Sequence, residues 1–322
     1  MDITPLSPTD EDAAYLVNQA SAEADTPDIP YWSHAAFRAR IHQPWPGHTC
    51  EHYIARAGDG HVAGVLELNF PTLDNLTLGH VQLAVHPSRR RQGLGRALYT
   101  LATERAHAHG RSHLIAPTVD RLPDGPAFAT AMGATAGLAE TRSRLDVADF
   151  DALGLTAPVA DGYRLAHWTD HAPDEHVDDL AYLDSRLMTD APNGDLAVEA
   201  EKIDATRFRQ SEQAIVSRNR TSFNVAAIHT ETGRAIAWTQ LTCPNDIRWQ
   251  AWQQITIVDP DHRGHGLGRT IKISNLSYAR SARPDLQAID TFNASANAAM
   301  LRVNDSLGFQ RRETWTQWQA TI

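Results

Sequence analysis

The sequence predicts an α/β (α+β) protein with two domains in tandem, and three observations support this. The chain has 322 residues, which is long for one hydrophobic core and suits two domains of about 150 residues. Strand-like and helix-like patterns alternate along it. A strand, a glycine-rich loop and a helix occur twice, the second time 173 residues after the first.

In the first half, apolar runs of strand type are followed by a helix. AGDG at 57–60 is the turn between two strands. Leu98, Leu101, Ala102 and Ala106 then fall on one helical face, which Gly110 ends. The expected elements are helices at 10–24 and within 26–41, strands at 52–57, 61–68 and 80–85, a helix at 96–109, a strand at 112–119, a helix at 125–134 and a strand at 140–147.

The second half repeats this order. TETG at 230–233 is again a hairpin turn, and Pro284 ends the helix after the glycine loop. The expected elements are a strand at 162–168, helices at 174–187 and 198–216, strands at 223–229, 234–241 and 252–258, a helix at 269–282, a strand at 286–294, a helix at 296–309 and a strand at 313–322. Residues 149–162 lack a clear period, so we expect domains at 1–148 and 163–322 joined by this linker.

Composition and charge argue against several classes of function. Hydrophobic residues make up 42% of the chain, and no apolar run reaches the roughly 18 residues of a membrane helix. The acidic amino terminus does not resemble a secretory signal, and only two cysteines are present, which favours a reduced cytoplasmic protein. A net charge of −10 argues against nucleic-acid and membrane partners and is compatible with a cationic small substrate. The histidines form no metal-binding motif, so we expect no metal.

The repeated loop has the geometry of an anion site. From Val85 to Arg96 and from Val258 to Arg269, seven of twelve residues are identical without a gap. A strand, a short glycine loop and a helix start present free backbone N–H groups to an anion. Neither copy continues as a P-loop or as the G-x-G-x-x-G of a dinucleotide fold. Both copies instead read R-x-x-G-x-G behind V-x-P.

This motif resembles the acyl-coenzyme A loop of the GCN5-related N-acetyltransferases (GNAT), and the order of elements around each copy is similar to that fold. The resemblance covers both halves and implies a tandem-domain protein, an architecture also found in mycothiol synthase. It implies a mixed, mostly antiparallel central sheet flanked by helices in each domain. It also implies acetyl-CoA as cosubstrate, with the thioester carbonyl near Ile257 or Val258, and near Ala84 or Val85 in the first domain. The implied cofactor-binding residues are Ile257, Val258, Arg263, Gly264, His265, Gly266, Gly268, Arg269, Asn293 and Asn297 in the second domain, and Ala84, Val85, Arg90, Arg91, Gln92, Gly93, Gly95 and Arg96 in the first.

The two copies differ downstream. Family members often carry an asparagine, then a tyrosine that protonates the leaving thiolate, then Gly-Phe. The second copy keeps Asn297 and Gly308-Phe309, but Asn304 stands where the tyrosine would, and an amide is not an acid. The first copy has neither the asparagine nor the tyrosine. We therefore expect catalysis in the second domain, with Asn304 beside the departing sulfur, and CoA binding alone in the first.

The sequence leaves the identity of the general base open. Glu67 is the kind of central-strand glutamate that the family uses, but its counterpart at the 173 offset is Gln240. Asp290 and the acidic residues of 190–201 (Asp190, Asp195, Glu199 and Glu201) are the second-domain candidates. Residues 186–201 lie where the resemblance implies the acceptor pocket, and the carboxylates of this segment suit a cation.

The leading hypothesis is N-acetyl transfer from acetyl-CoA to a primary amine of a small molecule by direct attack in a ternary complex. A narrower alternative is a mycothiol synthase-like enzyme. An alternative from another class is a non-catalytic CoA-binding sensor or interaction protein, which the missing tyrosine and the change from Glu67 to Gln240 motivate.

Overall fold

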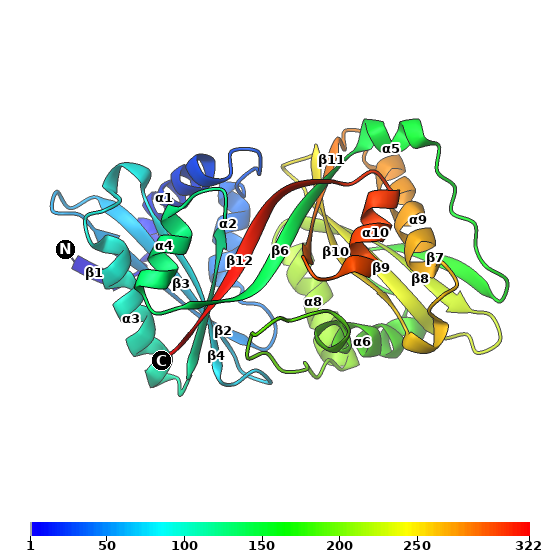
Figure 1. Ribbon diagram of the computed structural model, residues 1–322, viewed down its shortest axis with the longest axis horizontal. Helices are drawn as coiled ribbons and strands as arrows, with labels where there is room; N and C mark the ends of the chain where they lie inside the picture. Colours follow the sequence, from blue (N-terminus) through cyan, green and yellow to red (C-terminus); the bar gives the residue numbers. More distant parts are fainter. Residues whose placement is uncertain (1) are drawn as a thin grey trace. The chain divides into compact units, whose positions relative to one another are not determined.

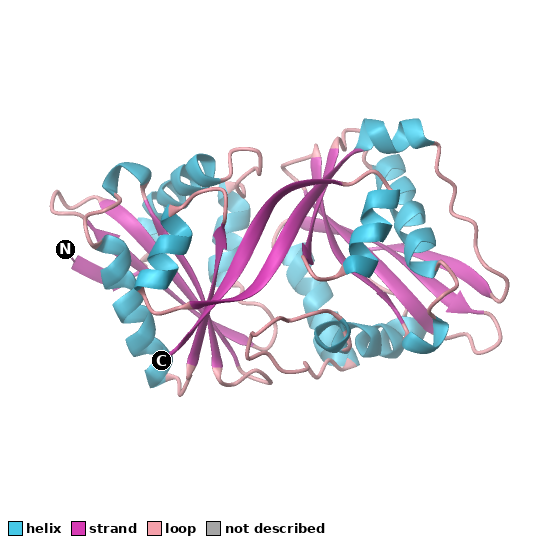
Figure 2. Ribbon diagram, in the orientation of Figure 1, coloured by secondary structure: helices cyan, strands magenta, loops and turns pink. Residues whose placement is uncertain are grey.

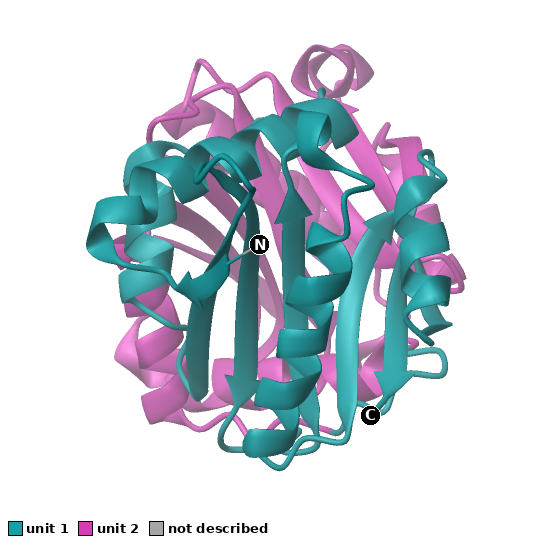
Figure 3. Cartoon of the chain, turned by 90° about the vertical axis from the view of Figure 1, so that its left-hand side faces the viewer, with its two compact units in different colours: residues 1–139, 193–199, 314–322 teal, residues 140–192, 200–313 magenta. Residues whose placement is uncertain are grey.

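The computed structural model describes residues 2–322, in which helices and strands alternate as the sequence predicts (Figures 1 and 2). The chain forms two compact units (Figure 3), and each has its own run of paired strands and its own hydrophobic core. No helix within residues 2–322 has the length and apolar character needed to cross a membrane.

The first unit comprises Met1–Ala139, Asn193–Glu199 and Thr314–Ile322. Its sheet has the order β1-β2-β3-β4-β5-β12, and only the β4/β5 pair among the recorded pairs is parallel. The elements from the first half of the chain are β1 (Asp2–Pro5), η1 (Pro8–Asp10), α1 (Glu11–Asp25), α2 (His34–His42), β2 (His48–Arg56), β3 (Val62–Pro71), β4 (Leu78–Val85), η2 (Pro87–Arg89), α3 (Leu94–Ala108), β5 (His113–Val119), α4 (Asp124–Ala131) and the start of β6 (Thr135–Asp146).

Helices cover both faces of this sheet. Leu66 and Leu68 of β3 pack against the apolar stripe of α3, which includes Leu98 and Ala102. Val65 points to the opposite face, where it packs in one cluster with residues of α1 and α2. Side chains alternate between the two faces along a strand, so Leu66 and Leu68 are buried on one face and Val65 is buried on the other.

The second unit comprises Glu140–Pro192 and Ala200–Glu313, and its sheet has the order β6-β11-β10-β9-β8-β7. Among the strand pairs recorded for this unit in residues 2–322, only β10/β11 is parallel, so the strands of both units pair in a mixed and mostly antiparallel way, which confirms the predicted fold class. The elements are α5 (Val147–Leu153), β7 (Tyr163–Thr169), η3 (Asp174–His176), α6 (Val177–Ser185), α7 (Leu187–Asp190), α8 (Ala205–Ser217), β8 (Arg220–His229), β9 (Ala235–Pro244), β10 (Gln250–Val258), η4 (Pro260–His262), α9 (Leu267–Ala282), β11 (Ala288–Ala294), α10 (Ala298–Ser306) and β12 (Gln310–Thr321). Every residue of β9 is buried, because α9 covers one face of the sheet and α6 and α8 cover the other.

In each unit, the last strand to join the order comes from the other half of the sequence. Residues 140–146 of β6 pair with β11 in the second unit, and residues 315–321 of β12 pair with β5 in the first. The compact units therefore differ from the predicted contiguous domains 1–148 and 163–322. The apolar and polar patterns of β6 and β12 suit an edge of either sheet, so the sequence does not reveal the exchange.

Two further segments differ from the sequence prediction. The expected linker 149–162 begins within α5, where Phe150 is buried. Leu155 and Ala157 follow the helix and pack against the core of the second unit. The helix expected from residue 198 begins at Ala205, where the Asp204 side chain caps it by accepting from the Arg207 N–H. Residues 193–199 instead belong to the first unit, where the Glu199 N–H donates to Asn75.

Candidate functional site

The parallel strands separate at the same point in both units. Pairing of β4 with β5 ends at His80 opposite Ile115, and pairing of β10 with β11 ends at Gln253 opposite Thr291. His80 and Gln253 are 173 residues apart, so the openings are equivalent. Beyond them β4 and β10 pair on one side only, with β3 and β9. The predicted residues Ala84, Val85, Ile257 and Val258 all lie on these singly paired stretches, and an extended polar ligand can pair with their free backbone edges.

The glycine loops join these strands to α3 and α9. Gly93 and Gly266 are the N-cap residues and are left-handed, with φ of 85° and 72°. The preceding turn is also left-handed, with φ of 64° at Arg91 and 87° at Gly264. Within residues 2–322, the backbone N–H groups of 91–95 and of 264–268 have no acceptor. Both loops therefore present converging donors at a helix start, which suits a pyrophosphate.

The first arginine of each motif braces the loop. The Arg90 Nε donates to the Val85 carbonyl at 3.2 Å, and its two Nη atoms donate to Asp25 at 2.8 Å. The Arg263 Nε likewise donates to the Val258 carbonyl at 3.2 Å, and Nη2 donates to Asp190 at 2.8 Å. This side chain was expected to hold phosphate. Arg90 and Arg263 are each already paired with an aspartate. The backbone N–H groups are therefore the primary hydrogen-bond donors for an anion.

The other predicted loop residues are more open. Arg91, Gln92, Arg96, Gly264 and His265 are exposed. Arg269 donates to the Ser306 hydroxyl at 3.3 Å. The two helix-start glycines face different neighbours, because a Cβ on Gly95 would lie 3.3 Å from the Phe128 ring of α4, whereas on Gly268 it would meet only Val258 at 3.7 Å. The space beside the start of α3 is therefore more filled than the space beside α9.

A β-bulge distinguishes the second opening. The β9/β10 register shifts between Gln253 and Thr256, whereas β3/β4 is regular throughout. The buried Gln253 amide stabilises the bulge, since its Nε2 lies 2.8 Å from the Gln240 carbonyl and 3.1 Å from the Ile255 carbonyl. Its Oε1 is buried without a partner in residues 2–322. Bulges occur often beside active sites because they redirect backbone groups and side chains.

Three polar side chains meet beside the second opening. The Asn304 Nδ2 donates to Asn293 Oδ1 at 2.7 Å, and Lys272 Nζ donates to Asn304 Oδ1 at 2.6 Å. Asn293 lies just beyond the last β11 residue that pairs with β10. Asn297, predicted to line the cofactor arm, caps α10 by accepting from the Met300 N–H at 3.1 Å. The sequence reasoning missed Lys272, although a lysine between Ile271 and Ile273 on the apolar face of a helix was a usable signal.

The structure favours a structural role for Asp290. Its side chain is fully buried, and it accepts from Arg142 Nη1 at 2.6 Å, from Arg144 Nη2 at 2.8 Å and from the Gln250 amide. Two guanidinium groups occupy its carboxylate oxygens, and its side chain has no exposed surface. This surrounding argues against the expected role as base, since a base must contact the substrate.

Glu67 is held in a comparable way. Arg40 forms a bidentate ion pair with it, with Nη2 at 2.7 Å from Oε1 and Nε at 3.2 Å from Oε2. The Arg40 guanidinium in turn lies 4.3 Å above the Trp32 ring. Its counterpart Gln240 donates to the Asn224 amide oxygen at 3.0 Å inside the second core. Glu67 is ion-paired and Gln240 is an amide, so neither of these equivalent positions supplies a free carboxylate.

A carboxyl group outside the acidic residues of 190–201, that of Asp184, has a shifted pKa. Burial raises the pKa of Asp184, in the last turn of α6, to about 7, and Glu201 adds to this rise while Arg207 opposes it. The neighbouring Leu183 packs in one cluster with Ile255 and Ile257 of β10. Of the other candidates, Asp190 is paired with two arginines, and Asp195 and Glu199 belong to the first unit. Asp184 is therefore the second-unit carboxyl group whose pKa suits a base near neutral pH.

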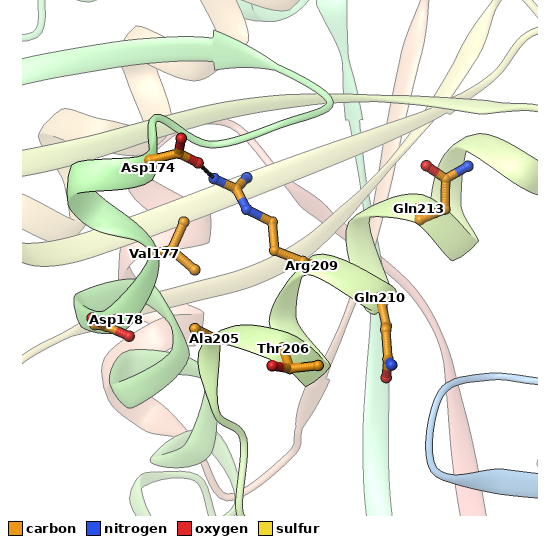
Figure 4. Close-up of a pocket in the computed structure, with 8 residues that line it drawn as sticks. All are labelled: Asp174, Val177, Asp178, Ala205, Thr206, Arg209, Gln210 and Gln213. Carbon is orange, nitrogen blue, oxygen red and sulfur yellow. Dashed lines mark hydrogen bonds and ion pairs between the residues drawn. The ribbon is translucent and has the colours of Figure 1, made fainter.

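A groove on the surface of α6 and α8 is separate from these residues (Figure 4). Most of its lining residues carry polar side chains, and Arg209 forms an ion pair with Asp174 within it. None of the predicted site residues lines this groove.

Comparisons with known proteins agree with the two-unit architecture. Residues 17–128 match the model of the Acetyltransferase (GNAT) family. The mycothiol acetyltransferase of Salinispora arenicola (strain CNS-205) is 26% identical, and the match covers 98% of this chain and 94% of that protein. The mycothiol acetyltransferase of Amycolatopsis mediterranei (strain U-32) is 29% identical over 83% of each.

Among solved structures, the tandem GNAT protein from the clavulanic acid biosynthesis pathway, determined without AcCoA, is 30% identical. It superposes with a TM-score of 0.85 over 99% of this chain and 98% of its own. A GCN5-related N-acetyltransferase from Sphaerobacter thermophilus has a TM-score of 0.68 at 14% identity, which shows the shared fold alone.

Proposed function

The chain belongs to the tandem GCN5-related N-acetyltransferases and is an acetyltransferase; from this premise we propose that it transfers an acetyl group from acetyl-CoA to a primary amine of a small molecule. Acetyl-CoA supplies a thioester whose carbonyl carbon the amine attacks directly in a ternary complex. The C–S bond breaks, the sulfur leaves as the CoA thiol, and the amine loses one proton.

We place the reaction in the second unit, and the β-bulge beside its strand opening is the observation that carries this assignment. The free N–H groups of residues 264–268 hold the pyrophosphate. The backbone N–H of Ile257 or Val258 donates to the thioester oxygen, and a fixed donor of this kind stabilises the negative charge that develops on it.

Two side chains complete the proposed chemistry. Asp184 accepts the proton of the substrate ammonium, directly or through water, since burial gives its carboxyl group a pKa of about 7. Asn304 hydrogen-bonds the departing sulfur, and water relays to this sulfur the proton that the attacking nitrogen loses as the C–S bond breaks. The first unit binds CoA through residues 90–96 or serves as a brace, because its opening lacks the bulge and both asparagines.

The test is release of free thiol when the purified protein is offered acetyl-CoA and a panel of primary amines. We expect release with at least one amine, together with an acetylated product in equal amount. CoA binding in a calorimeter without turnover of any amine would favour a non-catalytic sensor instead.

A second candidate function is a mycothiol synthase-like activity. Full-length similarity to two mycothiol acetyltransferases at 26% and 29% identity favours it. Asn304 at the position of the family's tyrosine argues against it. A cysteinyl glycoside amine in the same panel decides between the two, since preference for it over simple amines would support the second candidate.

A further inference from the structure

Lys272 of α9 is a cation in the apolar interior of the second unit. Its side chain is among the largest fully buried ones, and the centre of the Phe309 ring lies 5.1 Å from Nζ. Within residues 2–322 it forms no ion pair, and Asn304 is the hydrogen-bond acceptor recorded for it. A buried charge without a counterion destabilises a fold, and a methionine would fill the same space without that cost. Packing alone therefore does not account for a lysine here.

Lys272 determines how the Asn304 amide is oriented. An ammonium group only donates, so the amide oxygen of Asn304 must face Nζ, and its NH2 must face Asn293. One hydrogen of this NH2 is donated to Asn293, and the other has no acceptor within residues 2–322. Donation from a charged group also polarises the amide, which makes its N–H groups stronger donors.

The arrangement ends at the strand opening. Asn293 lies beyond Phe292 and Thr291, and Thr291 is the last residue of β11 that pairs with β10. The chain of contacts from Lys272 through Asn304 to Asn293 therefore connects the helix behind the glycine loop to the separated end of β11.

The first unit has no such arrangement. Tyr99 occupies the position equivalent to Lys272, 173 residues earlier, and its hydroxyl is buried without a partner in the described chain. Its ring packs against Phe128. The two units thus differ at this position in charge as well as in hydrogen bonding, and Tyr99 offers a matched control.

We infer that Lys272 is a positioning residue for acetyl transfer, which acts through Asn304 by holding its amide with the oxygen toward α9 and the NH2 toward the separated end of β11. This inference rests on the proposed function, which places the leaving sulfur beside Asn304. Burial lowers the pKa of Lys272 to about 7. The groups that contact Nζ, the Asn304 amide from α10 and the Phe309 ring, do not titrate.

The test compares Lys272→Met, Asn304→Ala and the double variant, with Tyr99→Phe as the control. We expect each single variant to lower kcat by about 10- to 100-fold, the range for loss of a hydrogen bond to a charged group. The double variant should be no slower than the slower single variant, because both changes remove the same interaction between Lys272 and Asn304. The wild-type kcat should fall as pH rises through the pKa of Lys272, and Lys272→Met should lack this fall. Tyr99→Phe should retain wild-type kcat.

Additive losses in the double variant, or an unchanged kcat in Lys272→Met, would overturn the inference. Failure of the proposed function is a distinct result, since the wild type then releases no thiol. In that case, NMR of the protein with labelled lysine ε-carbons tests whether Lys272 contacts Asn304 beside a CoA site. We expect the Lys272 signal to titrate near neutral pH and to move both in Asn304→Ala and on addition of CoA. A signal unaffected by CoA would contradict the inference, whatever the kinetics.

Discussion

Arg142 of β6 and Asp290 of β11 form an ion pair of 2.6 Å in which both side chains are fully shielded from solvent. Arg142 also binds Glu313 at 2.6 Å, and Arg144 binds Asp290 at 2.8 Å. The cluster therefore links β6, whose sequence belongs to the first half, to the sheet of the second unit.

Replacing Asp290 by Asn should destabilise the second unit, because it removes a buried carboxylate that pairs with Arg142 and Arg144, while Arg142 keeps its pair with Glu313. We expect a loss of about 3 to 5 kcal/mol in the free energy of unfolding. The control is Asp285→Asn, which breaks an exposed pair with Arg248 and should cost less than about 1 kcal/mol. Denaturant unfolding measures both. A variant of normal stability that has lost its activity would restore Asp290 as a catalytic candidate.

Gly266→Ala should weaken CoA binding by about 10-fold or more, because a methyl group intrudes on the backbone donors of the second loop. Gly233→Ala is a closely matched control, since its φ is 71° against 72° at Gly266, and a Cβ meets nothing within 4 Å at either site. Both variants carry the same strain of about 1 to 2 kcal/mol. Calorimetry with CoA separates the effects, and equal affinities would exclude the second loop from binding.

Gly93→Ala tests the first loop in the same manner. Its φ is 85°, and the hairpin residue Gly60, at 84°, is the control for the backbone strain. If both units bind CoA, Gly93→Ala should lower the number of sites from about two to about one, with a much smaller effect on kcat than Gly266→Ala. Loss of activity in Gly93→Ala but not in Gly266→Ala would move the reaction to the first unit.

The repeat explains why the sequence predicts so much of this fold. The glycines of each loop need left-handed backbone at Gly93 and Gly266, so the motif determines local geometry and is visible without any tertiary information. The strand openings follow at the same 173-residue offset. The exchange of β6 and β12 was not predicted, because it depends on which distant partner each strand finds.

The catalytic side chains were harder to predict because their roles depend on their surroundings. Asp290 and Glu67 are typical bases by residue type, but each is paired with arginine in the fold. Asp184 and Lys272 belong to no motif. Burial is the main cause that shifts the pKa of each of them to about 7, and burial of one particular side chain is a property of the folded chain.

Asp184→Asn should lower kcat by about 100-fold or more, the usual contribution of a general base. In the wild type, activity should fall as pH drops below about 7, because the carboxyl group becomes protonated there. Asp178→Asn, an exposed change on the same helix, is the control. The measurement is kcat as a function of pH, and a wild-type profile in Asp184→Asn would require another base.

Lys272 should also make the stability of the second unit depend on pH. Its pKa is lowered from 10.5 to about 7, so between these values the unfolded chain binds more protons than the folded one, and stability rises with pH. At neutral pH and below, the buried charge is a cost of up to about 5 kcal/mol. Lys272→Met should therefore be more stable than the wild type at neutral pH, and the difference should shrink toward pH 10.5. Urea unfolding at several pH values, with Tyr99→Phe alongside, measures this, and a difference independent of pH would show that Lys272 has the same pKa in the folded and the unfolded chain.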